Sequence, residues 1–219
     1  MLDLIKREIK IYFRNPSGIF MPILFFFLIV TIFPLSMSPD KNLLTSVVPT
    51  ILWITSIFII IFTTQNFFID DYNSGVFESY YLSKISIEKI FFSKILSSFI
   101  LFVFPLLFFI PLVIVFYDLN SAKSLIIFIT VLVSMPSLFI LSLFGVLITL
   151  GLSKQNYLSS IITLPFFMPN IIFSAKSVQQ IDSSFFLPPE LFFLMAILIL
   201  SLFLGPYLLA FTFKTSLQN

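Results

Sequence analysis

The sequence predicts an all-α, polytopic membrane protein with six transmembrane helices, and three observations lead to this fold class. Only 10% of the residues are charged and 59% are hydrophobic, whereas soluble domains carry about 25% charged residues. The apolar residues come in runs of about 20, the length that a helix needs to cross the hydrocarbon core. Polar segments separate these runs, and a helix satisfies its own backbone hydrogen bonds in lipid. We therefore expect a single membrane domain over residues 1–219.

Residues 1–15 are expected to form an amphipathic interfacial helix that lies along the membrane surface. Its apolar residues recur at three- and four-residue spacing on one face: Leu2, Ile5, Ile9, Tyr12 and Phe13. Its cations gather on another face, where they suit anionic lipid headgroups: Lys6, Arg7, Lys10 and Arg14. The dipeptide Asn15-Pro16 then predicts the end of the helix.

Six transmembrane helices are expected after the interfacial helix. Their approximate ranges are 19–35, 43–67, 95–116, 125–150, 158–175 and 191–213. Proline recurs within them, and because proline lacks a backbone N–H it kinks or breaks a helix interior. The kinks that we expect are at Pro34, Pro49, Pro165 and Pro169. Such kinks serve as hinges or fix the packing of neighbouring helices, and the two uses are compatible.

The distribution of lysine and arginine predicts the orientation in the membrane. With six spans, both termini, the connection 68–94 and the connection after the fourth span lie on one side, which carries most of the cations. The other side has only Lys41, Lys123 and Lys176. Loops rich in Lys and Arg stay in the cytoplasm. Both termini and residues 68–94 are therefore expected to be cytoplasmic, or on the equivalent side of an organelle membrane.

Residues 68–94 form the longest interval in which charged residues recur every few positions. Asn73-Ser74-Gly75 predicts a break after the second span. Ser86 is placed to cap a new helix that has Glu88 in its first turn and continues into the third span. We expect the order helix, turn, short surface helix, turn, helix. Such a surface helix either seats in a cleft of a soluble subunit, as a coupling loop, or simply joins two spans; both interpretations remain open.

The composition excludes several kinds of chemistry. The chain has no cysteine and no histidine, which removes thiolate and imidazole metal ligands and the usual general base. Asp70 and Asp71 are adjacent, so on a helix they point about 100° apart, and a metal site there is disfavoured. None of the five glycines begins a phosphate-binding P-loop. If ATP drives this protein, the ATPase is a separate chain.

The interiors of the predicted spans also carry little polar chemistry. None of them has a charge at mid-membrane, which argues against an ion-coupled secondary transporter. Asn170 follows Met168-Pro169, and an interhelical hydrogen bond is favoured over a substrate contact for its amide. A membrane enzyme is the least favoured class, because no polar catalytic cluster converges within the spans.

Five short stretches, taken together and in order, are similar to one known family. They are Lys6-Arg7-Glu8 with Arg14-Asn15-Pro16; Phe33-Pro34-Leu35; Pro49-Thr50-Ile51-Leu52-Trp53; Asp70-Asp71-Tyr72 through Gly75, Glu78 and Leu82-Ser83 to Lys94; and Leu164-Pro165-Phe166-Phe167-Met168-Pro169. They resemble the haem exporter protein B family (CcmB) of cytochrome c maturation, and cover nearly the whole chain. Thr50 stands where that family usually has Gly, and Lys84 and Ser86 stand in a stretch that is usually rich in proline.

The resemblance implies a six-span permease subunit of the type-2 ATP-binding cassette (ABC-2) architecture, which has no catalytic activity of its own. It implies a homodimer that works with two copies of a separate ATPase and with haem-handling membrane proteins of the same pathway. The expected contact with the ATPase consists of Asp70, Asp71, Tyr72, Gly75, Glu78 and Lys94. ATP binds to the partner, haem is a possible cargo, and no cofactor is expected on this chain itself.

The cellular role that the resemblance implies is haem export or delivery in c-type cytochrome biogenesis, including release of the haem-loaded chaperone. The expected location is the bacterial cytoplasmic membrane or, as an alternative, the mitochondrial inner membrane. An ABC-2 exporter of a drug, lipid or polysaccharide has the same architecture, so composition does not separate the two. An assembly factor without energy coupling is the third hypothesis.

Overall fold

The structure is a computed structural model that describes residues 2–14, 17–37, 41–82, 85–150, 152, 155–179 and 187–216. These ranges are mainly helical, and no β-strand occurs among them. The elements are α1 (Leu2–Arg14), α2 (Ser17–Ser36), α3 (Lys41–Asn73), α4 (Val76–Leu82), α5 (Ile87–Ser98), the π-helical turn η1 (Phe99–Val103), α6 (Phe104–Phe108), α7 (Ile110–Phe116), α8 (Ser121–Ile148), α9 (Gln155–Gln179) and α10 (Pro189–Ser216).

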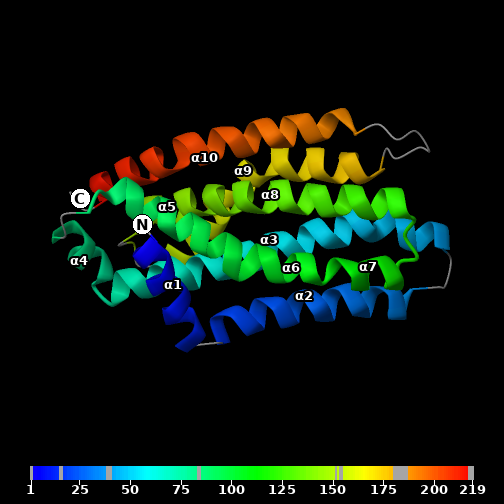
Figure 1. The fold of residues 1–219 in the computed structure, drawn as a ribbon, viewed down its shortest axis with the longest axis horizontal. Coiled ribbons are helices and arrows are strands. Elements are labelled where there is room, and N and C mark those ends of the chain that lie inside the picture. Colours follow the sequence, from blue (N-terminus) through cyan, green and yellow to red (C-terminus); the bar gives the residue numbers. More distant parts are fainter. Residues whose placement is uncertain are drawn as a thin grey trace.

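The long helices run side by side along the long axis of the molecule (Figure 1). The two short helices α1 and α4 lie together at one end, where α10 also finishes (Figure 1). We call this region, made of α1, α4, the last turn of α3, the first turns of α5 and the last turns of α10, the charged end. Both ends of the chain therefore approach the same end of the bundle, as an even number of spans requires.

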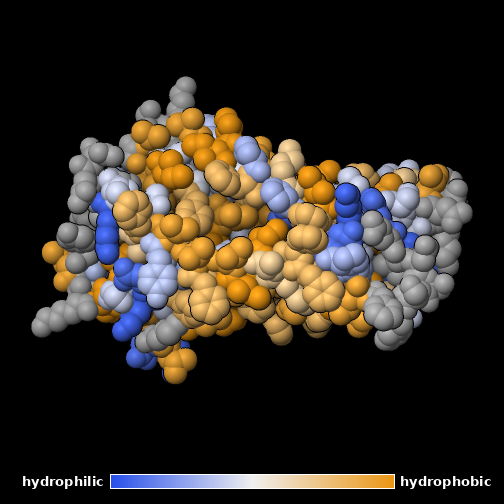
Figure 2. Space-filling view, turned by 90° about the horizontal axis from the view of Figure 1, so that it is seen from above, coloured by the Kyte–Doolittle hydropathy of each residue, from blue (hydrophilic) through white to orange (hydrophobic). Residues whose placement is uncertain are grey.

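The surface has the pattern of a membrane protein. Apolar side chains cover the middle of the face seen in Figure 2, and hydrophilic side chains gather toward its two ends. Five helical segments of the described chain are long and apolar enough to cross a membrane: 43–73, 87–116, 121–148, 157–179 and 189–215. The remaining predicted span, 19–35, corresponds to α2, whose apolar stretch Phe20–Ser36 is shorter. The predicted all-α polytopic membrane fold is confirmed.

The centre of the bundle is α8. In its most apolar window 67% of the residues are buried, against 22% in the corresponding window of α10, which presents most of its side chains outward. Close approach of α9 to α8 requires Gly145, because a Cβ at this position would overlap Thr163 Cγ2 and lie 2.9 Å from the carbonyl oxygen of Ser159. A small residue therefore sets the distance between these two helices.

The helices predicted within residues 68–94 are present in the predicted order. α3 continues to Asn73 and α5 begins at Ile87, so the two spans project beyond their apolar parts as helix. Charged side chains in these extensions pair with one another, as described below, and need not face water. Ser86 is the N-cap of α5, but its side chain makes no capping hydrogen bond. Ser83 and Lys84 lie outside the described residues.

The helices continue through the four predicted kink positions, Pro34, Pro49, Pro165 and Pro169. Among the helices that the structure describes, the third span is the one with internal breaks. Pro105 has no backbone N–H and cannot donate a hydrogen bond to the carbonyl oxygen four residues earlier. The π-helical turn η1 ends at Val103, and α6 begins at Phe104 with Pro105 as its second residue. A further break occurs at Phe109, and α7 starts at Ile110 with Pro111 at its second position. The connection 151–157, predicted to carry Lys154, lies partly outside the described residues.

Candidate functional site

The charged end is built around a sharp turn between α3 and α4. The hydroxyl of Ser74 donates to the carbonyl oxygen of Asp70 at 2.6 Å, and the backbone N–H of Gly75 donates to that of Tyr72 at 3.1 Å. Gly75 has φ of 69°, a left-handed conformation that glycine adopts at little cost at the end of a helix. The chain thus leaves α3 and starts α4 at Val76, at the outer edge of the bundle.

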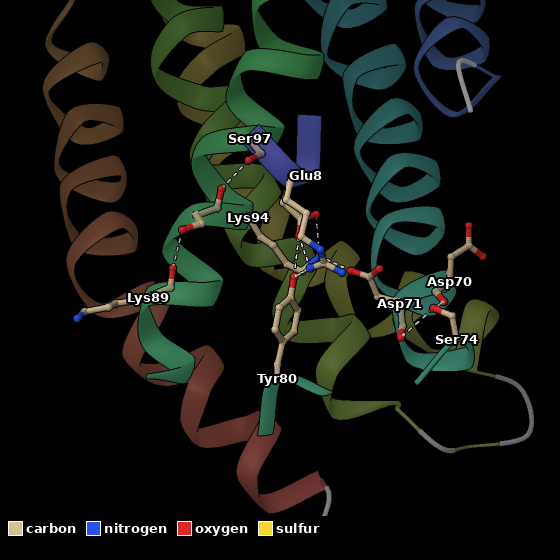
Figure 3. A network of polar contacts seen from close by, with 10 residues as sticks. Glu8, Asp70, Asp71, Ser74, Tyr80, Lys89, Lys94 and Ser97 are labelled. Carbon is tan, nitrogen blue, oxygen red and sulfur yellow. Dashed lines mark hydrogen bonds and ion pairs between the residues drawn. The ribbon is translucent and has the colours of Figure 1, made fainter. Parts of the chain in front are cut away.

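Lys94, on α5, is the buried centre of this end. Its side chain is 1% exposed, and burying an ammonium group is costly unless anionic partners surround it. Its Nζ lies 3.1 Å from Oε2 of Glu8, on α1, and also donates to Oδ2 of Asp71, on α3. Figure 3 shows the two carboxylates approaching the ammonium from different helices. One lysine therefore joins three helices.

Tyr80 brings α4 into the same network. Its hydroxyl donates to Oε1 of Glu8 at 2.9 Å, and it accepts a hydrogen bond from Nη1 of Arg7. The guanidinium of Arg7 also lies 5.1 Å from the centre of the Tyr80 ring, within range of a cation–π interaction. Burial and the nearby Glu8 carboxylate raise the pKa of Tyr80, so its hydroxyl keeps the proton that it donates.

We call Arg7, Glu8, Asp71, Tyr80 and Lys94 the Lys94 cluster. Its two cations and two carboxylates balance in formal charge. Lys94, Glu8 and Asp71 are largely buried, whereas the Arg7 side chain is 42% exposed, and the pairing limits the electrostatic cost of the buried charges. Aromatic rings form one wall of the cluster: Lys94 Nζ lies 5.1 Å from the centre of the Phe68 ring, which stacks on Phe91. This combination of charge balance and an apolar wall is suited to holding helices in a fixed arrangement.

The outer surface of the same end is available to another molecule. Asp70 points away from the Lys94 cluster (Figure 3) and is exposed, as are Ser74 and Ser79. Leu82, at the tip of α4, is 85% exposed although it lies beyond the apolar helices that could span the membrane. Leu82 thus presents an apolar side chain on a short helix outside the membrane part of the chain.

The structure separates the six residues predicted to contact an ATPase into two groups. Asp70 and Gly75 lie at the surface of the turn, whereas Asp71 and Lys94 are partners inside the Lys94 cluster. Tyr72 is half-buried and packs against the apolar residues of the charged end. Glu78 belongs to α4, but its side chain lies outside what the structure describes. Buried Lys94 offers its ammonium to other helices of this chain.

The cations of the predicted interfacial helix differ in their contacts. Lys6, Lys10, Arg14 and Arg7 are all exposed, as a surface helix requires, but Arg7 in addition contacts Tyr80. Glu8, which is 3% exposed, was not among the residues predicted to have a functional role. A signal was present: Glu8 follows Ile5 by three residues and precedes Tyr12 by four, so it lies in the middle of the apolar face.

A second buried polar region, the α8–α9 seam, lies away from the charged end. It consists of Thr130, Ser134 and Ser137 on α8 and Asn170, Ser174 and Ser177 on α9. The hydroxyls pair across the helices, Thr130 with Ser177 at 3.1 Å and Ser134 with Ser174 at 2.7 Å. Asn170 donates to Ser137 Oγ at 2.6 Å, which confirms the interhelical hydrogen bond predicted for it.

Together, the fold and the charged end define a multi-pass α-helical membrane protein in which buried ion pairs join α1, α3 and α5, and a tyrosine hydrogen bond attaches the short outer helix to α1. Among the described residues, no group of three side chains that could ligate a metal occurs. The model of the CcmB protein family matches residues 1–216, and the chain belongs to this family. The family predicted from the five short stretches is thereby confirmed.

Three curated relatives of the chain match it along almost all of their length. "Heme exporter protein B" of Haemophilus influenzae is 28% identical over 218 residues, covering 100% of this chain and 99% of the relative. The protein of the same description from Shigella flexneri is 29% identical, with 96% of each chain covered. That of Pseudomonas aeruginosa is 24% identical, with 97% of this chain and 96% of the relative covered.

Proposed function

We propose that this chain is the permease subunit of an ABC transporter that exports or delivers haem for c-type cytochrome biogenesis. The family membership and the description of the relatives as heme exporter protein B support this role. The chain has no P-loop in its sequence, so a separate ATPase subunit hydrolyses the ATP. The chain itself is non-catalytic, and haem is its cargo.

The observation that carries the proposal is the arrangement of α4. This short helix is exposed at its tip through Leu82 and anchored at Tyr80, while Asp71 and Lys94 tie together the two helices that flank it. A force applied to α4 therefore reaches α3 through the turn at Gly75, and reaches α5 through Tyr80, Glu8 and Lys94. We assign the tip of α4, with Asp70, Gly75 and Glu78, as the contact with the ATPase.

The orientation follows from the same arrangement. The cations Lys6, Lys10, Lys89 and Lys214 are exposed at the charged end, where α1 and α4 lie. A side rich in lysine faces the cytoplasm, and ATP is available there. We place both termini in the cytoplasm and the protein in the bacterial inner membrane, as a homodimer within a larger complex that includes haem-handling membrane proteins of the same pathway.

A pair of matched substitutions tests the contact. Leu82 and Leu35 are 85% and 78% exposed and lie at opposite ends of the bundle. In proteoliposomes with the partner ATPase, we expect Leu82→Asp to abolish the ATP turnover stimulated by this chain, because a charge replaces the apolar contact. Leu35→Asp, a change of the same type on the other side, is expected to retain it.

If the Leu82→Asp variant stimulates ATP turnover as much as the unchanged protein does, the proposed contact is wrong. The nature of the cargo is measured separately, by the haem content of the intact complex and by the yield of c-type cytochromes in cells that carry each variant. Suppose that the chain stimulates ATP turnover in proteoliposomes, but cells that lack the chain still make c-type cytochromes in normal yield. The transporter class would then stand, and haem would be excluded as the cargo.

A further inference from the structure

The N-terminal helix α1 packs on the bundle through the face that carries Glu8. Ile5 and Glu8 are its buried residues, and Leu4, Ile9 and Tyr12 pack against the apolar residues of the charged end. Tyr12 meets Phe102 edge to face, with ring centres 6.2 Å apart. Leu2 and Phe13, by contrast, remain 73% and 70% exposed. α1 is therefore attached to the protein along one face and free to meet lipid along another.

The two carboxylate oxygens of Glu8 contact two different elements. Oε1 accepts the hydrogen bond from Tyr80, on α4, and Oε2 lies 3.1 Å from Lys94 Nζ, on α5. The carboxylate is only 4% exposed, so water does not screen these contacts strongly. Hydrogen bonds to an ionised group are about twice as strong as those between neutral groups. Glu8 thus attaches α1 both to the short outer helix α4 and to α5.

The connection from α1 to α2 is short. α1 ends at Arg14 and α2 begins at Ser17, so two residues separate the two helices. A chain spans at most about 3.5 Å per residue when fully extended. A displacement of α1 that exceeds this reach must move the start of α2 as well. α2 is thus linked to α4 through α1, although it is far from α4 in the sequence.

We propose that Glu8 is a positioning residue that makes α1 move with α4, so that a displacement of the outer helix reaches α2 through α1. This route is additional to the covalent route through α3 and α5. The origin of the displacement rests on the proposed function, in which an ATPase acts on α4. The attachment of α1 to α4 does not depend on it and is measurable on this chain alone.

A purely stabilising role for Glu8 predicts something different. If the carboxylate only contributed to folding, its loss would lower the amount of active protein, and ATP turnover and cargo delivery would fall in proportion. If it transmits movement, the ATPase still engages α4 and hydrolyses ATP, while fewer cargo molecules are delivered for each ATP. The ratio of delivery to hydrolysis therefore separates the two roles.

The attachment is tested by the distance between spin labels on α1 and α4. The chain has no cysteine, so Lys10→Cys/Ser79→Cys places both labels at exposed positions without other reactive sites. We expect one narrow distance distribution in the full chain in nanodiscs. Glu8→Gln and the milder Tyr80→Phe should each add a second, longer distance from molecules in which α1 is detached from α4. For Glu8→Gln we expect the ratio of detached to attached molecules to rise about tenfold. Glu88→Gln, which breaks an exposed Glu–Lys pair at the same end, is the control and should leave it unchanged.

The transmission is tested in proteoliposomes that hold the partner ATPase and report haem delivered per ATP hydrolysed. Glu8→Gln is expected to keep ATP turnover and to lower this ratio several-fold. In the same Lys10→Cys/Ser79→Cys background, a bis-maleimide that matches the measured label distance joins the two introduced thiols and should restore the ratio. The restoration identifies the role as a link between helices, because a cross-link on the surface does not replace a buried ion pair.

Three results would overturn the proposal: unchanged label distances in both Glu8→Gln and Tyr80→Phe, a proportional fall of turnover and delivery, or no restoration by the cross-link. The proposed function fails in a different way. If the unchanged chain does not stimulate the ATPase at all, the coupling role of α4 is wrong, and the label distances still decide whether Glu8 holds α1 to α4.

Discussion

The Lys94 cluster and the α8–α9 seam are two buried polar regions that join helices by different chemistry. The cluster uses ionised groups at the charged end, and it ties together α1, α3, α4 and α5. The seam uses neutral hydroxyl and amide groups within the apolar part of the bundle, and it joins two long helices side by side. Each type of group lies where its burial is least costly.

The difference shows how the protein combines a fixed bundle with a strongly held outer end. A neutral hydrogen bond between helices in a membrane contributes about 0.6 kcal/mol on average, and several in a row hold α8 and α9 in register. A buried ion pair that loses one partner costs about 3–5 kcal/mol, because the other charge is left uncompensated. The larger interaction lies where we propose that an external force acts.

The largest effect is expected at the centre of the cluster. Lys94→Met removes the ammonium and leaves the carboxylates of Glu8 and Asp71 buried without their cation. We expect a loss of about 3–5 kcal/mol in the free energy of unfolding. The matched control is Lys89→Met, an exposed lysine of the same helix.

The measurement is unfolding in mixed micelles, followed by the fluorescence of Trp53, which is the only tryptophan and is 1% exposed. Equal unfolding free energies for Lys94→Met and Lys89→Met would mean that the cluster is not a structural centre. In that case the comparison with the seam would lose its basis.

The next largest effect is expected where α9 approaches α8. Gly145→Ala places a methyl group against Thr163 and the Ser159 carbonyl oxygen, and we expect a cost of about 1–3 kcal/mol from overpacking. Gly205→Ala is the matched control, because its added Cβ meets a side-chain methyl of Ile140, at 2.8 Å, and no backbone atom within the same range. Both glycines meet a methyl group of a β-branched side chain, but Gly145 also meets a backbone oxygen, so we expect the larger cost there. A larger cost for Gly205→Ala would contradict this account of the seam.

Within the seam, Asn170→Ala tests the neutral hydrogen bonds. It removes the donor to Ser137 Oγ and the acceptor for the Ser174 hydroxyl, at 3.2 Å. We expect a loss of up to about 1.7 kcal/mol, smaller than for Lys94→Met, because no charge is left unpaired. Met168→Ala on the exposed side of α9 serves as the control. If Asn170→Ala cost as much as Lys94→Met, the distinction between charged and neutral regions would not hold.

The smallest effect is expected for the other Glu–Lys pair of the charged end. Glu88 and Lys214 are 3.3 Å apart, with side chains 32% and 51% exposed. Because water screens exposed charges, we expect Glu88→Gln to cost at most about 1 kcal/mol. The same unfolding assay compares it with Glu8→Gln. Equal costs for the two variants would show that burial does not distinguish the two pairs.

The sequence predicts the helical spans well, because long apolar runs and the breaks between them are local features. The turn at Ser74-Gly75, the start of a helix after Ser86 and the hydrogen bond of Asn170 also follow from local signals. The pairing of charges at the ends of the spans does not. Asp71 and Lys94 are separated by 23 positions, and no local signal shows that their side chains meet in space.

The sequence predicted which segment carries the candidate site, but not which of its side chains pair with one another. A charged interval indicates a surface, and the exposed positions of Asp70 and Ser79 agree with this. That Asp71 and Lys94 face inward depends on Glu8, which lies on the N-terminal helix far away in the sequence, and on the hydroxyl of Tyr80. Periodicity places Glu8 on the apolar face of α1, but it does not say which cation the carboxylate meets.

The central claim is that the charged end faces the compartment where ATP is available. The most direct test uses Ser79→Cys on α4 and Ser121→Cys at the start of α8, both exposed and at opposite ends of the bundle. Each variant is treated with a membrane-impermeant maleimide in right-side-out and in inside-out vesicles. We predict that the Ser79→Cys variant reacts only in inside-out vesicles and the Ser121→Cys variant only in right-side-out vesicles. Reaction of the Ser79→Cys variant in sealed right-side-out vesicles would contradict the account.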